Sequence, residues 1–217
     1  MELSRSNDLY KRINIGGVDL NQRYNRQLDR TVCEIFAGDY YSTKDTNLVF
    51  STLLGSCISV CLRDKTTKIS GMNHFMLPSA VRGDNILFND DARYGMQSME
   101  LLINSMMKLG ATRNGLQAKV FGGGKVLGTT VTAVSDSNVQ FALSYLQMEQ
   151  IPILSRDVGS DVGRKIFFFP ESFEVYVKKI RYNKTLETAV AREKEFMQFM
   201  NKKKEQEKAK DDNITFF

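Results

Sequence analysis

The scarcest reactive residue in this sequence is histidine, because His74 is the only one among 217 residues. A single imidazole excludes sites that need several, such as a zinc ion held by three histidines or the HExxH helix of metalloproteases. Any acid–base chemistry that uses an imidazole must therefore use His74.

Cysteine is also scarce, with only Cys33, Cys57 and Cys61 in the chain. None of them belongs to a CxxC pair, which argues against a zinc ribbon and against a dithiol redox motif. The N-terminal residues lack the apolar core of a secretory signal. We therefore expect free thiols and a reducing, cytoplasmic environment.

Long apolar runs are missing as well. The longest stretch without a charged residue, Thr46–Leu62, has 17 residues and is rich in Ser, Thr, Asn and Gly, so no membrane insertion is expected. The net charge is +5, but no stripe of Lys and Arg alternates with aromatic residues, so nucleic acid is not an expected partner. The mild positive charge favours an acidic protein partner instead.

The composition divides the chain into three regions. Residues 1–30 are polar and predict a loosely ordered N-terminal extension, whereas residues 31–182 hold most of the glycines and apolar runs and predict one domain. Residues 183–217 predict a charged C-terminal helix or tail. The helix carries a thin apolar stripe at Val190, Met197 and Met200. It is either a solvated helix that frays or a helix that docks onto a partner.

Within the domain, strand-like and helix-like patterns alternate. Helices are predicted over 90–109 and from Asp136 or Ser137 to about residue 150. Strands are predicted over 48–50, 58–62, 68–77, 116–121, 126–134, 151–154, 165–169 and 173–178. This pattern predicts an α/β fold, a single layered domain with a mixed, largely antiparallel sheet and packed helices.

The cysteine and the histidine that could work together are Cys57 and His74. A polar turn, residues 63–68, separates their two strands. If the hairpin is centred between Lys65 and Thr66, the numbers of opposed residues sum to 131, so Cys57 faces His74. Directly opposed residues have Cβ atoms about 4.5–5.5 Å apart. A slip of one residue would turn His74 to the other face of the sheet.

Such a pair suits nucleophilic catalysis, because a nearby imidazolium stabilises a thiolate and can then protonate the leaving group. Cys57 follows a Gly-Ser pair, so backbone N–H groups can approach an oxyanion. A third polar group should orient the imidazole, and Ser51 and Thr52 are the candidates. The alternative is structural: Cys57 fills space in the core and His74 is a satisfied strand histidine.

The glycine run Gly122–Gly124 matches neither the GxGxxG dinucleotide motif nor the P-loop, so no nucleotide cofactor is expected. Flexible or tightly packed backbone is the better interpretation of these glycines.

Several sequence blocks resemble, in order, the CheD family of chemoreceptor glutamine deamidases from bacterial and archaeal chemotaxis. The resemblance covers about residues 45–180. The blocks are Leu54–Leu62, Gly71–Pro78, Arg93–Gly95 with Met99 and Glu100, Lys119–Gly123, and Arg156–Gly159 with Gly163–Lys165.

The resemblance implies an activity. Enzymes of this family hydrolyse glutamine side-chain amides on the cytoplasmic helices of methyl-accepting chemoreceptors, giving glutamate and ammonia through a cysteine thioester. The family nucleophile matches Cys57 and the family histidine matches His74. The third member is a threonine, which ungapped matching places at Ser51, whereas the neighbouring Thr52 has the family's residue type. Both remain candidates.

The resemblance also implies a fold like the deamidating domain of cytotoxic necrotizing toxins and a reaction without metal or cofactor. A CheC-type phosphatase is an implied partner, and receptor methyl esters are a further implied substrate. Two other functions stay open: a non-catalytic adaptor that binds the phosphatase or receptors and regulates adaptation, and a thiol hydrolase such as a methylesterase. The C-terminal segment Asn213–Phe217 faintly resembles the peptide by which some chemoreceptors tether their modifying enzymes. The alternative interpretation is a disordered terminus.

Overall fold

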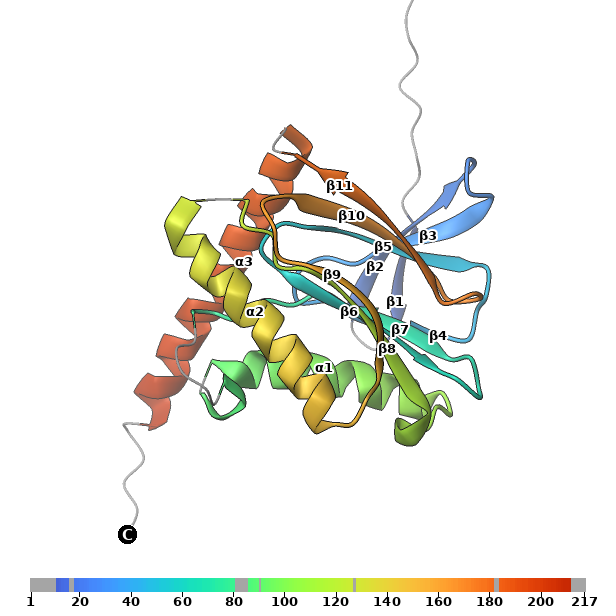
Figure 1. Ribbon diagram of the computed structural model, residues 1–217, viewed down its shortest axis with the longest axis horizontal. Helices are drawn as coiled ribbons and strands as arrows, with labels where there is room; N and C mark the ends of the chain where they lie inside the picture. The colour runs from blue at the N-terminus through green and yellow to red at the C-terminus, as the bar shows by residue number, and fades with distance from the viewer. Residues whose placement is uncertain are drawn as a thin grey trace, which may run out of the picture.

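The computed structural model describes residues 11–15, 18–80, 86–89, 91–126, 128–181 and 184–211. Within these residues, two mixed β-sheets and three α-helices form the α/β fold in Figure 1. The first sheet has the order β1 (Lys11–Ile15), β2 (Val18–Asn25), β3 (Arg30–Glu34), β5 (Leu48–Leu54), β10 (Gly163–Phe169) and β11 (Glu174–Ile180). The second has the order β4 (Tyr40–Thr43), β7 (Ser70–Asn73), β6 (Ile58–Asp64), β8 (Leu116–Gly122) and β9 (Ile153–Val158).

The strand pairing is largely antiparallel, as predicted. Only the pairs β3–β5 and β8–β9 are parallel among the described strands. The strands divide between two sheets, whereas the sequence suggested one. The likeness to the toxin deamidase domain stays a prediction.

Strand β6 separates two hydrophobic cores. Ile58, Val60 and Leu62 pack against α1 (Ala92–Lys108) and α2 (Gly128–Met148). The alternate residues, including Cys57 and Cys61, lie in the second core with side chains of the first sheet. This confirms the predicted faces of β6, and it places Cys57 on the side that faces the other sheet.

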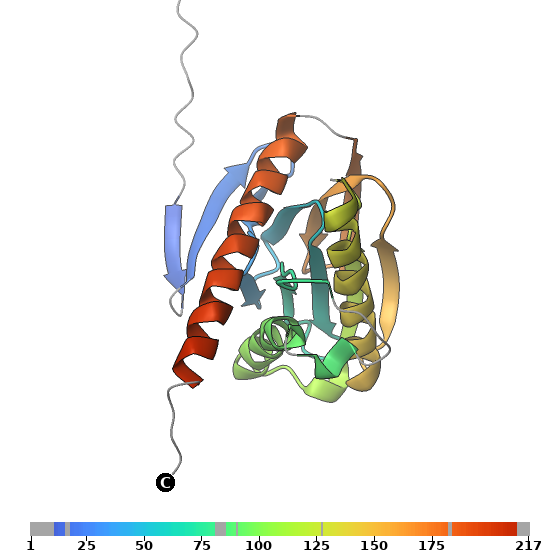
Figure 2. The ribbon, with the colours of Figure 1, turned by 90° about the vertical axis from the view of Figure 1, so that its left-hand side faces the viewer.

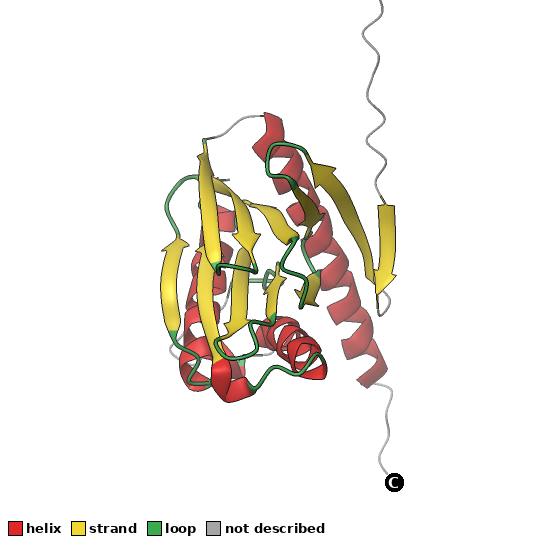
Figure 3. Cartoon of the chain, turned by 90° about the vertical axis from the view of Figure 1, so that its right-hand side faces the viewer, coloured by secondary structure: helices red, strands yellow, loops and turns green. Residues whose placement is uncertain are grey.

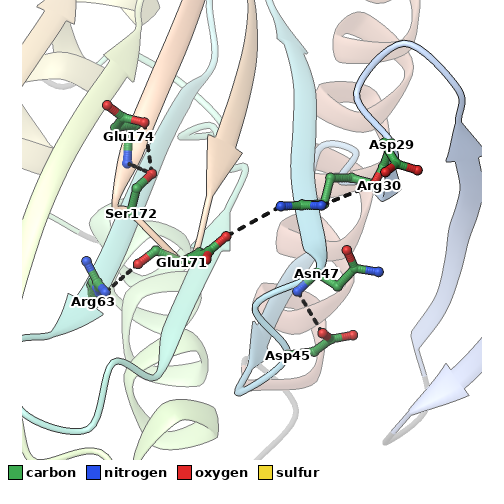
Figure 4. Close-up of polar contacts among 8 residues, drawn as sticks. All are labelled: Asp29, Arg30, Asp45, Asn47, Arg63, Glu171, Ser172 and Glu174. Carbon is green, nitrogen blue, oxygen red and sulfur yellow. Dashed lines mark hydrogen bonds and ion pairs between the residues drawn. The ribbon is translucent and has the colours of Figure 1, made fainter.

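The two sheets are also tied at the turn between β10 and β11 (Figure 4). Arg63 of β6 donates a hydrogen bond to the Glu171 carbonyl at 2.6 Å, and the Glu171 carboxylate lies 3.6 Å from the Arg30 guanidinium of β3. Exposed pairs of this kind contribute about 0–1 kcal/mol each to the free energy of folding. The association of the two sheets therefore depends mainly on the buried core between them.

The predicted strand over 126–134 is wrong, because α2 begins at Gly128. Asp136 and Ser137 consequently lie inside the helix and do not cap it. Threonine and valine lower helix propensity by no more than about 0.7 kcal/mol per residue, which tertiary packing readily outweighs. Further along α2, Phe141 and Tyr145 are fully buried in the helix-side core and anchor the helix.

The N-terminal segment is more ordered than expected. Residues 18–25 form β2, which pairs antiparallel with β3, and β1 adds a further strand beyond it. Main-chain hydrogen bonds along a sheet edge require no apolar side chains, so hydrophobicity gave no sign of these strands. The domain boundaries at residues 30 and 182 stay a prediction.

The hairpin between β6 and β7 has a different register from the predicted one. Ile58 bridges Phe75, so opposed residue numbers sum to 133 and Cys57 does not directly face His74. A shift of two residues keeps each side chain on its predicted face, because strands alternate with period two. Cys57 and His74 are therefore diagonal neighbours on one face, still within reach of each other.

Asp64 explains the shift. Its buried carboxylate accepts backbone hydrogen bonds from Thr66 at 2.8 Å, Thr67 at 3.3 Å and Thr112 at 2.7 Å. Lys68 closes the loop in the left-handed region, with φ at +62°. The turn is therefore centred one residue later than the sequence suggested, because a side chain that caps backbone N–H groups selects its geometry.

We expect Asp64→Ala to lower the free energy of unfolding by about 2–4 kcal/mol, because it leaves buried backbone donors unpaired. Urea denaturation measures the loss. Asp45→Ala is the matched control: this more exposed carboxylate accepts a backbone hydrogen bond from Asn47 (Figure 4), and its loss should cost about 1 kcal/mol or less. Equal destabilisation by the two substitutions would contradict the assignment.

The effect should depend on pH. Burial alone would raise the pKa of Asp64, but the backbone N–H groups of Thr112, Thr66 and Thr67 outweigh it and lower that pKa. A lowered carboxyl pKa contributes stability that is present above the unfolded value of about 3.9 and is lost as the pH falls through the folded value. The difference between wild type and Asp64→Ala should therefore shrink in acid.

The C-terminal region forms α3 (Lys184–Asp211), which confirms the predicted charged helix over these residues. Figure 2 shows α3 as a long helix running in front of the strands, and in Figures 2 and 3 it stands between the N-terminal strands β1 and β2 on one side and α1 and α2 on the other. The stretch Asn213–Phe217 lies outside the described residues. Among the helices that are described, none has the length and hydropathy needed to cross a membrane.

Candidate active site

Three buried side chains meet where the chain passes from β5 to β6. The Cys57 sulfur, a ring nitrogen of His74 and a carboxylate oxygen of Glu193 all lie within 4.8 Å of one another. Cys57 is fully buried, and His74 and Glu193 are 3% and 4% exposed. The structure therefore brings together the predicted cysteine and histidine, and it adds an acidic residue from α3.

Thr52 orients the imidazole. Its hydroxyl donates a hydrogen bond to the Ile35 carbonyl at 2.6 Å and lies 2.8 Å from His74 Nδ1. Since the single hydroxyl proton goes to the carbonyl, Nδ1 must carry the proton that it donates to Thr52. His74 Nε2 is then the unprotonated nitrogen, and it has no hydrogen-bond partner among the described residues.

Ser51 does not reach the histidine. Its hydroxyl donates to the Ile166 carbonyl of β10 at 3.0 Å. Adjacent residues of a strand point to opposite faces, so only one of Ser51 and Thr52 can face His74. Of the two hydroxyl residues, Thr52 is the one that contacts His74.

Burial lowers the pKa of His74, although the nearby Glu193 carboxylate acts in the opposite direction. The ring is therefore neutral at pH 7, because even the ordinary histidine pKa is about 6.5. A neutral imidazole with a free Nε2 can accept a proton from a thiol.

Glu193 is held by the segment that precedes the cysteine. Its carboxylate accepts hydrogen bonds from the Gly55 N–H at 2.7 Å, the Ser56 N–H at 2.9 Å and the Ser56 hydroxyl at 2.9 Å. These donors form an anion-binding site beside the thiol. Groups of this kind can stabilise the oxyanion of a tetrahedral intermediate.

Sequence reasoning missed Glu193, although the sequence contained a signal. The buried residues of α3 recur at helical spacings of four, three and seven, in the order Leu186, Val190, Glu193 and Met200. An acidic residue in the middle of a buried apolar stripe requires a partner, because a buried charge is costly unless it is hydrogen-bonded.

Asn138 of α2 was also missed. Its side chain donates to the Ser56 carbonyl at 3.0 Å and accepts from the Leu77 N–H at 2.7 Å. It thereby joins the segment before Cys57 to the segment after His74.

The glycine run packs against the same loop. The Gly123 N–H donates to the Cys57 carbonyl at 2.7 Å, and a Cβ at Gly122 would lie 2.2 Å from that carbonyl oxygen. Tight backbone packing, one of the two interpretations that the sequence allowed, is therefore what this run provides.

The cysteine thiols are protonated in this conformation. Burial raises the pKa of Cys57 well above its usual range, and the charge and hydrogen bond of Glu193 raise it further. Burial also raises the pKa of Cys33 to about 12 and the pKa of Cys61. Cys57 differs from the other two because it forms one compact group with His74 and Glu193.

A cavity of about 1030 Å³ opens next to the site and reaches Thr52, His74 and Glu193. Seven of its lining residues are Lys or Arg and two are Glu. The basic residues are Arg23, Lys165, Lys178, Lys179, Arg181, Lys184 and Arg192. A cleft lined by positive charge raises the local concentration of acidic ligands.

Cys57, His74 and Glu193 are also the described residues that could hold a small metal ion, since each offers one ligand atom. The Glu193 carboxylate already accepts three hydrogen bonds, which stabilise its negative charge without a cation. The arrangement has the elements of a cysteine hydrolase: a thiol, a neutral base, a residue that orients the base and an anion-binding pocket.

Comparison with known proteins assigns the family. The family model CheD, described as CheD chemotactic sensory transduction, matches residues 76–179. The chain is 47% identical over 173 residues to "Probable chemoreceptor glutamine deamidase CheD 1" of Shewanella oneidensis, covering 76% of this chain and 82% of that protein.

Two further relatives agree. "Probable chemoreceptor glutamine deamidase CheD 2" of Chromobacterium violaceum is 43% identical over 166 residues, with coverage of 76% and 82%. "Probable chemoreceptor glutamine deamidase CheD" of Janthinobacterium sp. is 44% identical over 162 residues, with coverage of 74% and 79%. The chain belongs to the CheD family.

Proposed function

We propose that this CheD-family chain is a chemoreceptor glutamine deamidase, in which Cys57 is the nucleophile, His74 the proton shuttle and Thr52 the residue that orients His74. The observation that carries the proposal is that the buried Cys57 sulfur lies within 4.8 Å of a neutral histidine whose Nδ1 is fixed by Thr52. The relatives' names supply the substrate, a glutamine side chain of a chemoreceptor.

The reaction begins when the Cys57 thiol gives its proton to His74 Nε2 and the sulfur adds to the side-chain carbonyl carbon. The N–H groups of Gly55 and Ser56 hold the oxyanion. The carbon–nitrogen bond then breaks, and ammonia leaves with the proton from His74. Water hydrolyses the thioester after giving a proton to His74, and that proton returns to the sulfur as glutamate is released. No step requires a metal or cofactor.

The basic cleft supports an acidic protein substrate. Seven Lys and Arg residues line the cavity beside His74, five of them outside α3, and this charge favours a helix with acidic side chains near the reactive glutamine. We place the reaction in the cytoplasm, where the expected reduced thiols and the cytoplasmic helices of receptors would meet.

Incubation of the protein with a receptor cytoplasmic fragment tests the proposal. We expect release of ammonia and a gain of about 1 Da for each modified glutamine, as hydrolysis of an amide to an acid requires. Release of methanol from a methylated fragment, without ammonia, would favour a methylesterase. Binding without either product would favour the adaptor. Binding to a CheC-type phosphatase stays a separate prediction.

Thr52→Val should lower the deamidation rate about 10-fold to 100-fold, because it removes the hydroxyl that fixes the His74 tautomer while keeping the side-chain volume. Ser51→Ala is the matched control and should stay within about twofold of wild type, since its hydroxyl contacts a strand carbonyl. Initial rates on a receptor fragment measure both. The opposite ranking of the two variants would assign the orienting role to Ser51.

A further inference from the structure

The carboxylate that occupies the candidate site belongs to the protein itself. Glu193 is a glutamate side chain presented by a helix, and glutamate on a helix is the product that the proposed reaction leaves on a receptor. Its carboxylate lies within 4.8 Å of the Cys57 sulfur and accepts the hydrogen bonds of Gly55 and Ser56. The chemical group is therefore that of the product, and it lies beside the proposed nucleophile.

The surface beneath α3 is shaped for a closely packed helix. A Cβ at Gly55 would lie 2.8 Å from the Glu193 carboxylate, and one at Gly163 would lie 2.4 Å from the Leu186 side chain. At Gly38, which has φ at +91°, a Cβ would lie 2.6 Å from the Phe196 ring. Glycine at three separate points lets the helix approach the strand ends and brings the residue at position 193 to the thiol.

The contact also blocks the reaction. Cys57 is fully buried, and this burial, together with the Glu193 charge and hydrogen bond, raises the pKa of the thiol and keeps it protonated. A substrate glutamine needs the donors that Glu193 occupies, so both cannot bind at once. Three hydrogen bonds from Gly55 and Ser56 hold the buried Glu193 carboxylate. The rest of α3 is strongly charged and largely exposed.

We infer that α3 is an internal occupant of the groove that receives the substrate helix, with Glu193 lying where the carboxylate of a newly formed product glutamate lies. This inference rests on the proposed function. It adds the docking surface to that function. A substrate helix replaces α3 and presents its glutamine at the position of Glu193. The apolar residues of the substrate helix are buried where Val190 and Met200 lie. Release of α3 is required before a receptor can react.

If α3 occupies the substrate groove, a glutamine introduced at position 193 should itself be deamidated by the enzyme. In Glu193→Gln the Cys57 sulfur adds to the introduced side-chain carbonyl, the carbon–nitrogen bond breaks, and ammonia leaves. Water then replaces the sulfur and restores glutamate at position 193. Peptide mass spectrometry of the full-length variant should show a gain of about 1 Da at this position, with first-order kinetics that do not depend on protein concentration.

Two variants serve as controls. Cys57→Ala combined with Glu193→Gln should keep the amide. Glu195→Gln places an amide at an exposed position of the same helix and should also keep it, which excludes spontaneous deamidation of α3. A complementary variant, Glu193→Ala, should raise kcat/KM on a receptor fragment about tenfold, because it weakens an intramolecular competitor.

The outcomes separate this inference from the proposed function. Deamidation at position 193 that requires Cys57 supports the inference. Wild-type activity on receptors together with a stable amide in Glu193→Gln overturns the inference and leaves the proposed function intact. A lower receptor activity of Glu193→Ala, in a variant with unchanged unfolding, overturns it in favour of a positioning role for Glu193. Absence of both reactions overturns the inference and the proposed function together.

Discussion

His74→Ala lowers the rate of receptor-glutamine hydrolysis about 10³-fold or more, because general acid–base catalysis contributes about 10² to 10⁴ and His74 performs two proton transfers. The chain has no second histidine to replace it. Ammonia release from a receptor fragment measures the rate, and unfolding curves show whether the variant keeps its fold. A folded variant that retains a tenth of the activity would exclude His74 as the proton shuttle.

The same assignment predicts a pH dependence. Burial lowers the pKa of His74, so the neutral form that accepts the thiol proton prevails above about pH 6.5. As the pH falls through the lowered pKa, the ring becomes charged, and kcat/KM, which reports the free enzyme, should fall with it. The acid limb of the wild-type rate should therefore lie below pH 6.5, and a limb well above that value would contradict the buried neutral histidine.

The faces of the strands could be predicted from the sequence, but their register could not. Alternation alone placed Cys57 and His74 on the same side of the hairpin, and a shift of two residues preserved that side. The shift itself came from Asp64, whose carboxylate collects backbone donors from the turn and from Thr112. Thr112 lies 48 residues further along the chain, so local turn rules could not include it.

The third member of the site illustrates a similar limit. Ser51 and Thr52 are both hydroxyl residues on one strand, and the sequence does not say which of them faces His74. In the structure the Thr52 hydroxyl lies 2.8 Å from His74 Nδ1 and also donates to the Ile35 carbonyl at the end of β3, a neighbouring strand of the first sheet. Such a pairing is a property of the tertiary fold.

The contribution of α3 was the least predictable part. Its charge and length predicted a helix correctly, and docking onto a partner was one of two interpretations. The helix instead packs on its own domain, where Glu193 contacts Gly55 and Ser56 across 138 and 137 residues of chain. The apolar spacing around Glu193 marked a buried face, but only the fold shows what that face covers.

Cys57→Ala should abolish receptor deamidation, with a residual rate at the uncatalysed background. The substitution removes the sulfur that forms the thioester, and Cys57 is the thiol that groups with His74 and Glu193 among the described residues. Cys61→Ala is the matched control. It removes an equally buried thiol from the same face of β6 and should cost stability, with little effect on kcat in the folded protein.

The decisive experiment for the role of Cys57 is peptide mass spectrometry of one receptor cytoplasmic fragment, incubated in parallel with wild type, Cys57→Ala and Cys61→Ala. We expect a gain of about 1 Da at defined glutamines with wild type and with Cys61→Ala, and none with Cys57→Ala. The same gain with Cys57→Ala would exclude Cys57 as the nucleophile.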